Sequence, residues 1–378
     1  MLINANALSI PLAANSVHTI VTSPPYYGLR DYGTATWQGG DPECDHIQGL
    51  DNPRSSRPAG RFHGGDDKFI TTPYKDVCGK CGAIRIDEQI GLEQTPDEYI
   101  ANLVAVFREC KRILRDDGTL WVVIGDSYCG TGDKGEWTDP KYAEGRNGQK
   151  VALNKKIDGL KSKDLIGIPW MLAFALRADG WYLRQDIIWA KPNPMPESVK
   201  DRCTKSHEYI FLLSKSAKYY YDNEAVMEIA TGFDGRKDTK YKGGPKDMAG
   251  GAHERWQYKN LQPDGQQPNT MHLNRLVGEE YMSPVRNKRD VWTVPTKPYK
   301  GAHYATFPPE LIKPCILAGA PEGGIVFDPF VGSGTTVATA IQLGRKGIGI
   351  DLSFKYLHEN AKLRVASAEL PLLNYIEQ

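Results

Sequence analysis

Residues 22–27, with the sequence TSPPYY, carry side chains suited to holding a planar amine. They follow an apolar run at residues 17–21, which is typical of a buried strand in a parallel sheet. The two prolines cannot donate ladder hydrogen bonds, so the chain must leave the sheet here, at a carboxyl end where open α/β folds bind ligands. The hydroxyl of Ser23 and the ring of Tyr26 on a rigid loop suit a nucleobase turned out of its stack. The alternative is a plain strand terminator with Tyr26 packed inward.

A second candidate site lies in residues 324–351. A strand ends at Asp328, a glycine-rich turn through Gly332 and Gly334 follows, and a helix then leads to a strand that ends at Asp351. This order is typical of a βαβ unit whose glycines let a ligand approach the backbone and whose last acid suits a ribose hydroxyl. The turn is neither Gly-x-Gly-x-x-Gly nor a P-loop, so we expect no dinucleotide site. Asp328 suits a ligand that carries an ammonium group.

A third set of side chains has the spacing of a metal site. A Cys-x-His pair and a Cys-x-x-Cys pair offer the four sulfur and nitrogen ligands that tetrahedral Zn²⁺ binds. The four residues are Cys44, His46, Cys78 and Cys81. They lie in residues 34–90, a stretch with few apolar residues, so a structural zinc would supply its order. His63 is an alternative to His46, and an ordinary loop with reduced thiols is the other interpretation.

Helices and strands alternate in the elements that must position these groups. Thr95, Pro96 and Glu98 form an N-cap, a first-turn proline and a capping-box acid, and predict a helix that ends before Gly118. Further elements are a helix at residues 169–178 and strands at residues 2–8, 119–124, 181–189 and 208–213. Asp126, after one of these strands, is either a ligand contact or a loop cap. The alternation predicts an α/β fold with a doubly wound, mostly parallel sheet.

The composition is that of an ordinary globular protein. The chain has 378 residues, of which 40% are hydrophobic and 25% are charged, and its net charge of +1 means that any nucleic-acid surface must be local. Seven cysteines are an odd count, and one Cys-x-x-Cys pair beside one Cys-x-His pair fits metal binding better than a disulfide framework. The sequence contains no apolar run of membrane-spanning length and no leader of the secretory type, so we expect a cytoplasmic protein that is not membrane-bound.

Residues 222–288 interrupt the alternation of helices and strands. They combine Gly, Asn, Gln and Pro with scattered aromatic and basic side chains. Amide, basic and aromatic groups are the types that contact phosphates and base edges. A nucleic-acid contact region is therefore one interpretation of this stretch, and a solvated loop is the other.

Taken together, the motifs TSPPY at residues 22–26 and FVGSG at residues 330–334 resemble the S-adenosylmethionine-dependent DNA methyltransferases that modify exocyclic amino groups. The catalytic tetrapeptide precedes the cofactor loop, as in the circularly permuted beta group of that family, and residues 289–309 resemble its lead-in to the cofactor loop. The resemblance covers residues 1–33, 87–220 and 289–360.

The resemblance implies a Rossmann-like methyltransferase fold with three regions. Residues 1–221 would form the catalytic part, with a zinc-module-like insertion at 34–90. Residues 222–288 would form the target-recognition region, and residues 289–378 the cofactor-binding part. Implied partners are double-stranded DNA and, because the family often pairs, a second copy of the chain in a homodimer.

The resemblance also assigns residues. The target base would be held by Ser23, Pro24, Pro25 and Tyr26. The residues expected to bind S-adenosylmethionine are Thr22, Thr306, Phe307, Pro308, Asp328, Pro329, Phe330, Gly332, Ser333, Gly334, Thr335 and Asp351.

We therefore expect an enzyme that methylates an exocyclic amine of a flipped base in a site-specific manner. Serine at the first tetrapeptide position is commoner among the family's cytosine-N4 members, which favours cytosine N4, with adenine N6 as the alternative. An RNA or protein N-methyltransferase is a remoter alternative. A catalytically silent DNA-binding protein is disfavoured because both motifs are intact.

Overall fold

The computed structural model describes residues 1–28, 35–48, 72–73, 77–130, 157–229, 276–277, 280–281, 285–297 and 307–373. The chain divides into two compact units. The first unit comprises Met1–Pro24, Val104–Gly125 and Pro169–Gln378, and the second comprises Pro25–Leu103 and Asp126–Ile168. The boundaries predicted from the sequence, at 221/222 and 288/289, stay a prediction.

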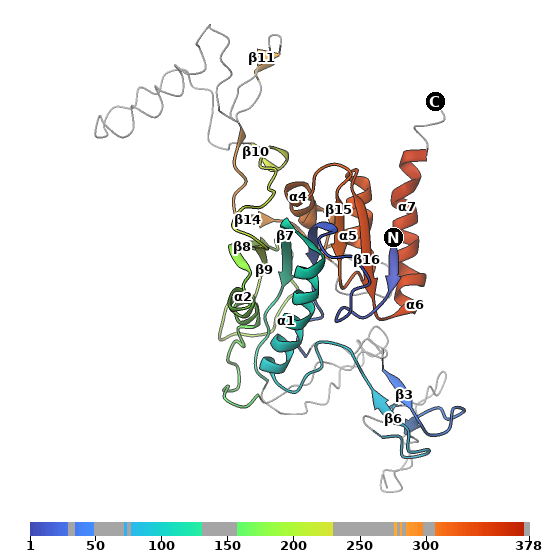
Figure 1. The fold of residues 1–378 in the computed structure, drawn as a ribbon. Helices are drawn as coiled ribbons and strands as arrows, with labels where there is room; N and C mark the ends of the chain where they lie inside the picture. Colours follow the sequence, from blue (N-terminus) through green and yellow to red (C-terminus); the bar gives the residue numbers. More distant parts are fainter. Residues whose placement is uncertain are drawn as a thin grey trace, which may run out of the picture. The chain divides into compact units, whose positions relative to one another are not determined.

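An eight-stranded sheet forms the centre of the first unit, in the order β1-β16-β15-β2-β7-β9-β8-β14 (Figure 1). The strands are β1 (Leu2–Asn4), β2 (Val17–Thr22), β7 (Leu114–Ile124), β8 (Tyr182–Ala190), β9 (His207–Ser214), β14 (Val291–Thr293), β15 (Ile325–Asp328) and β16 (Lys346–Asp351). All neighbouring strands pair in parallel except β9, which is antiparallel to both β7 and β8. The predicted α/β fold with a mostly parallel sheet is confirmed.

Helices alternate with these strands along the chain. They are α1 (Pro96–Ile113), α2 (Ile168–Ala178), α4 (Pro309–Gly319), α5 (Thr335–Gln342), α6 (Phe354–Tyr356), a π-helical turn (Leu357–Ala361) and α7 (Lys362–Leu373). The predicted capping box begins α1, because the Glu98 amide donates to the Thr95 hydroxyl and the Thr95 amide donates to the Glu98 carboxylate, both at 3.2 Å.

Two strand bounds differ from the prediction by more than one residue. The first strand ends at Asn4 and not at residue 8, because the side chain and carbonyl of Asn6 accept from the amides of Leu8 and Ser9 and turn the chain. β7 begins at Leu114, five residues early, and its pairing with β2 shifts register between Val17 and Thr19.

The central strands β2 and β7 bury side chains on both faces of the sheet. Val21 and Trp121 pack in one buried cluster with Leu311, Ile312 and Ile316 of α4. Their neighbours in β2 and β7, which point to the opposite face, are Ile20, Leu120 and Val122, and all three are fully buried. This explains why the strands are continuous apolar runs in the sequence.

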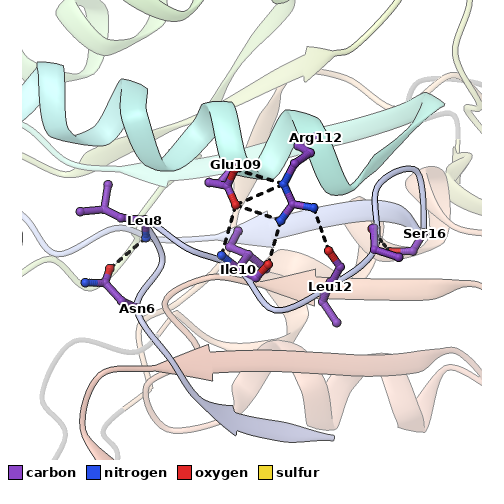
Figure 2. A network of polar contacts seen from close by, with 8 residues as sticks. Asn6, Leu8, Ile10, Leu12, Ser16, Glu109 and Arg112 are labelled. Atoms are coloured by element: carbon purple, nitrogen blue, oxygen red, sulfur yellow. Dashed lines mark hydrogen bonds and ion pairs between the residues drawn. The ribbon is translucent and has the colours of Figure 1, made fainter.

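A polar network fastens the segment that joins β1 to β2, residues 5–16 (Figure 2). β1 and β2 are consecutive in the chain but β16 and β15 lie between them in the sheet. The guanidinium of Arg112 on α1 donates to the carbonyls of Ile10 at 2.7 Å and Leu12 at 2.8 Å, and it also pairs with Glu109. The Glu109 carboxylate accepts from the Ile10 amide at 3.2 Å. The network therefore fixes the path that delivers β2 to the centre of the sheet.

The second unit contains short antiparallel ribbons. β3 (Thr36–Gln38) pairs with β6 (Ile84–Ile86), and β4 (Ile47–Gln48) pairs with β5 (Thr72–Pro73). These ribbons fall within residues 34–90, where the sequence has no clear period.

The region expected to recognise the target lies largely outside the described residues. At its two ends, β10 (Glu228–Ile229) pairs antiparallel with β13 (Val285–Arg286). The Glu228 carboxylate accepts from Arg286 at 2.9 Å and from Arg289 at 2.6 Å, which lowers the pKa of this carboxyl group against the effect of burial. Among the helices of the described ranges, none is long and apolar enough to cross a membrane.

Candidate active site

The loops after β2 and β15 meet at one edge of the sheet. β15 pairs in parallel with β2, with Val326 opposite Thr19 and Phe327 opposite Ile20, so both strands end at the same edge. There the Thr22 hydroxyl donates to a carboxylate oxygen of Asp328 at 2.6 Å. The tetrapeptide and the glycine-rich turn are thus joined directly by the residues that precede them.

Asp328 is a buried anchor for the glycine-rich turn. Its side chain accepts from the hydroxyls of Thr22 and Thr336, each at 2.6 Å, and from the amide of Phe330 at 3.0 Å. Burial raises the pKa of Asp328 to about 6, although these three donors favour the charged form and lower the pKa. The two oxygens hold the turn in place, and the contact between Asp328 and an ammonium group stays a prediction.

Asp351 ends β16 beside the same turn. Its carboxylate accepts from the amides of Gly332 at 3.1 Å and Ser353 at 2.9 Å. Burial raises the pKa of Asp351, with both amides acting in the opposite direction. A carboxylate has about four lone-pair positions, so after two hydrogen bonds it can still accept from the hydroxyls of a ribose.

The turn itself requires its glycines. Gly332 and Gly334 have φ of 47° and 82°, values that side chains on Cβ disfavour. A Cβ on Gly334 would also lie 3.0 Å from the Cα of Ala361, in the π-helical turn that precedes α7. The turn is therefore packed tightly against the C-terminal helix.

Two residues that no sequence motif indicated contact this turn or the strand end beside it. Arg364, on α7, donates to the hydroxyl of Ser333 at 3.0 Å and to that of Thr335. Asn4, on β1, donates to the backbone carbonyl of Asp351 at 2.9 Å. Both come from elements that only the three-dimensional arrangement brings to the turn, and Asn4 would have required knowledge that β1 pairs with β16.

The other residues expected at the cofactor are placed as follows. Pro329 and Phe330 continue the chain from Asp328 into the turn. Phe307 packs against the cluster that contains α4, and the buried Pro308 is the N-cap of that helix. Thr306 lies outside the described residues, so its predicted role stays a prediction.

Of the two adjacent tyrosines in the tetrapeptide loop, Tyr27 and not Tyr26 fills the interior. Tyr27 is 5% exposed, and its hydroxyl donates to the carbonyl of Gln94 at 3.1 Å. Its ring lies 5.5 Å from that of Tyr99, whose hydroxyl donates to the carbonyl of Pro25 at 2.7 Å. Burial raises the pKa of Tyr27 to about 12. Tyr26 is partly exposed, as is Ser23, so their predicted roles at a base remain compatible with the structure.

Asp126 acts as a loop cap. Its carboxylate accepts from the amides of Ser127, Gly167 and Ile168, at 2.9 to 3.0 Å, and so caps the start of α2. The sequence left a ligand contact and a loop cap open for Asp126, and the hydrogen bonds in the structure are those of the loop cap.

The four expected metal ligands converge in the second unit. The ligand atoms of Cys44, His46, Cys78 and Cys81 all lie within 4.8 Å of one another. The sulfurs of Cys44 and Cys78 are 3.8 Å apart, and the sulfur of Cys81 is 3.5 Å from Nδ1 of His46. Tetrahedral ligands with zinc–sulfur bonds of about 2.3 Å would be separated by roughly 3.8 Å, so the donor set and its spacing fit Zn²⁺. His63, the alternative ligand, lies outside the described residues.

The fold and both motifs are those of an α/β methyltransferase. A family model described as DNA methylase matches residues 17–362, and the chain belongs to this DNA methylase family. The sequence-based recognition of an S-adenosylmethionine-dependent DNA amino-methyltransferase is thereby confirmed, as is the expectation of an enzyme.

The chain is similar to named type II methyltransferases and to a solved DNA methyltransferase structure. The chain is 41% identical over 359 residues to the type II methyltransferase M.Cfr9I of Citrobacter freundii, covering 94% of this chain and 84% of the relative. It is 38% identical over 338 residues to the type II methyltransferase M.SmaI of Serratia marcescens, covering 89% and 80%. Among solved structures, the cytosine-N4-specific PvuII DNA methyltransferase matches the fold with a TM-score of 0.50 and 13% identity, covering 99% of this chain and 92% of that chain.

Proposed function

We propose that this protein transfers a methyl group from S-adenosylmethionine to the N4 amino group of a cytosine flipped out of double-stranded DNA. The hydrogen bond between Thr22 and Asp328 supports this most directly, because it holds the start of the tetrapeptide beside the glycine-rich turn. The relatives at 41% and 38% identity are type II methyltransferases, which favours methylation at a defined DNA sequence.

The residues at the turn fit the cofactor. The turn after Asp328 would bind the methionine part, and the remaining acceptor positions of Asp351 would receive the ribose hydroxyls. Gly332 and Gly334 keep side chains away from a ligand that must approach the backbone closely. Bound S-adenosylmethionine would supply a methyl group on a sulfonium, so that the amine could take the methyl group in one step with S-adenosylhomocysteine as the leaving group and one proton lost from the nitrogen.

The tetrapeptide would prepare the amine for this displacement. The amino nitrogen of a nucleobase is a weak nucleophile because its lone pair is delocalised into the ring. The Ser23 hydroxyl and the Pro24 carbonyl would accept its two hydrogens and favour a tetrahedral, more nucleophilic nitrogen. The Tyr26 ring would stack on the base, at roughly 1–3 kcal/mol, and offset part of the cost of flipping. Correct positioning would supply the remaining acceleration.

Nucleoside mass spectrometry tests this proposal. Unmethylated bacteriophage DNA would be incubated with the protein and a cofactor whose methyl group carries deuterium. We expect labelled N4-methylcytosine. Labelled N6-methyladenine would show that the enzyme is a DNA amino-methyltransferase whose target is adenine and not cytosine. Labelled 5-methylcytosine would overturn the proposal, and so would label found only in an RNA or protein substrate.

We also propose that Cys44, His46, Cys78 and Cys81 hold one structural Zn²⁺. Support comes from the donor set and from two distances between ligand atoms, 3.8 Å from Cys44 to Cys78 and 3.5 Å from Cys81 to His46, which suit a tetrahedral site. Metal analysis should find one zinc per chain in wild-type protein. Cobalt substitution should give the absorption bands of tetrahedral thiolate coordination, and protein without bound metal would contradict the site. The homodimer stays a prediction, which sedimentation of the purified protein tests.

A further inference from the structure

The proposed metal ligands and the tetrapeptide loop belong to one continuous path in the second unit. The loop at residues 25–28 leads on to β3 and then to the first ligand pair. The second pair is followed by β6, and the chain then returns to the loop at Gly91. A metal bound by both pairs would therefore link the segment that follows the tetrapeptide loop to the segment that returns to it.

The ribbon is packed directly against the ligands. β3 and β6 pair antiparallel with Thr36 opposite Ile86 and Gln38 opposite Ile84. The ring of Trp37, in β3, stacks on the ligand His46 with centroids 4.4 Å apart. Just beyond β3, Gly40 has a φ of 73°, and a Cβ there would lie only 2.7 Å from the sulfur of Cys81. A rearrangement of the ligands would therefore displace the ribbon.

The other end of the ribbon is fastened to the tetrapeptide loop. The Gly28 amide donates to the Gly91 carbonyl at 2.8 Å. Gly91 has a φ of 102°, and a Cβ there would lie 3.1 Å from the carbonyl oxygen of Tyr26. Between β6 and Gly91, the Asp87 carboxylate pairs with Arg85 at 3.0 Å and accepts from the Gln89 amide at 3.2 Å. The segment from the second ligand pair to the tetrapeptide loop is thus short, and hydrogen bonds and an ion pair hold it along its length.

In the part of the chain that the structure describes, the ribbon itself buries little apolar surface. Each of its strands has three residues, and Ile84 and Ile86 are 55% and 38% exposed. A two-stranded ribbon of this size without a hydrophobic face is marginally stable in water. Metal binding contributes free energy directly to the order of such a segment.

We propose that the metal held by this cluster orders the tetrapeptide loop, so that losing the metal impairs capture of the target base but not binding of the cofactor. The inference rests on the proposed zinc and the proposed base-binding role of Tyr26. The glycine-rich turn belongs to the other compact unit, so its affinity for S-adenosylmethionine serves as an internal control.

The test compares three variants with the wild-type protein. Cys81→Ser removes a ligand, Gly40→Ala crowds the Cys81 sulfur without removing a ligand, and Cys203→Ser is a matched control because Cys203 is exposed and outside the cluster. Four quantities are measured for each variant: zinc per chain, amide hydrogen exchange in residues 26–28 and in the non-proline residues of 91–99, the Kd for S-adenosylmethionine, and kcat on unmethylated bacteriophage DNA.

We expect Cys81→Ser to lose zinc, to exchange the amides of residues 26–28 at least tenfold faster and to lose at least tenfold in kcat, with the cofactor Kd changed less than twofold. Gly40→Ala should change in the same direction, and Cys203→Ser should match wild type. Zinc loss without faster exchange would overturn the proposal. If the cofactor Kd rises along with the exchange rate, the metal supports the whole protein and the proposal is again wrong. Hydrogen exchange and zinc content remain measurable even if the wild-type protein does not methylate DNA. A failure of the proposed function can therefore be distinguished from a failure of this inference.

Discussion

The Thr22 hydroxyl lies 2.6 Å from a carboxylate oxygen of Asp328, although 306 positions separate the two residues in the sequence. Thr22 is the last residue of β2, and Asp328 is the last residue of β15, the strand next to it in the sheet. This hydrogen bond joins the ends of the two strands from which the loop proposed to hold a base and the turn proposed to hold a methyl donor continue. We expect both the stability and the activity of the protein to depend on this arrangement and on the contacts that support it.

Asp328→Asn should stabilise the protein at alkaline pH and not at acidic pH. Burial raises the folded-state pKa of Asp328 to about 6 from an ordinary value of 3.8, so the buried charge costs stability above that pKa. The cost is on the order of 3 kcal/mol at pH 8 and disappears as the pH falls towards 4. The difference in Tm between variant and wild type should therefore be positive at pH 8 and close to zero at pH 4.

An asparagine amide can replace the Asp328 carboxylate because the hydroxyl groups around it can donate or accept a hydrogen bond. The side-chain oxygen of the introduced amide would accept from Thr22 and Phe330, and its nitrogen would donate to Thr336, whose hydroxyl also lies 3.4 Å from the carbonyl of Val21. A Tm difference that grows as the pH falls would contradict the assigned direction of the pKa shift.

Tyr26→Ala should lower kcat/KM for DNA and leave the affinity for S-adenosylmethionine nearly unchanged. Loss of base stacking is worth roughly 1–3 kcal/mol, or about 5-fold to 150-fold in kcat/KM for DNA. Tyr26→Phe keeps the ring and serves as the control, which should retain most of the activity. Steady-state kinetics on DNA and calorimetry with S-adenosylmethionine measure the two quantities, and an equal loss of both would show that Tyr26 is structural.

Arg364→Ala should weaken binding of S-adenosylmethionine about tenfold. Arg364 donates to the hydroxyls of Ser333 and Thr335, so its removal frees the turn to adopt other conformations. Because Arg364 acts by positioning the turn, kcat at saturating cofactor should change little while the KM for the cofactor rises. Lys362→Ala, at an exposed position of the same helix, is the matched control. A fall in kcat with no change in KM would rule out this positioning role.

Arg112→Ala should destabilise the fold by about 2 kcal/mol or more. Its guanidinium donates to two backbone carbonyls of the segment between β1 and β2 and pairs with Glu109 (Figure 2), and hydrogen bonds from charged groups contribute about 1.5–3 kcal/mol each. Arg115→Ala is the control, because that side chain pairs only with the half-exposed Asp117 among the described contacts and should cost less than about 1 kcal/mol. Chemical denaturation measures both, and equal losses would contradict the role given to Arg112.

The parts of the fold that could be predicted from the sequence have local signals. The prolines after β2, the glycines of the turn and the capping box of Thr95 and Glu98 each restrict the backbone where they stand. Strand and helix periodicity then placed the acids Asp328 and Asp351 at strand ends. The Cys-x-x-Cys pair likewise indicated a metal ligand set, which the structure brings together with Cys44 and His46.

The rest depends on tertiary packing, which leaves no local pattern. Tyr26 and Tyr27 are adjacent and identical in type, and Tyr27 is the one that packs against Tyr99 and bonds to Gln94. Arg364 lies on α7, beyond the π-helical turn, and contacts Ser333 and Thr335 about thirty residues away in the sequence. Asp126 finds its partners at Gly167 and Ile168, some forty residues away, so its capping role could not be distinguished from a ligand contact.

A crystal structure of the protein with S-adenosylhomocysteine and a DNA duplex containing its target sequence would test the central claim most directly. We predict a ribose bound to Asp351, the homocysteine along the turn after Asp328, and a flipped base whose amino nitrogen is held by Ser23 and faces the cofactor sulfur. A cofactor bound away from this turn, or a target base that remains stacked in the duplex, would contradict the account.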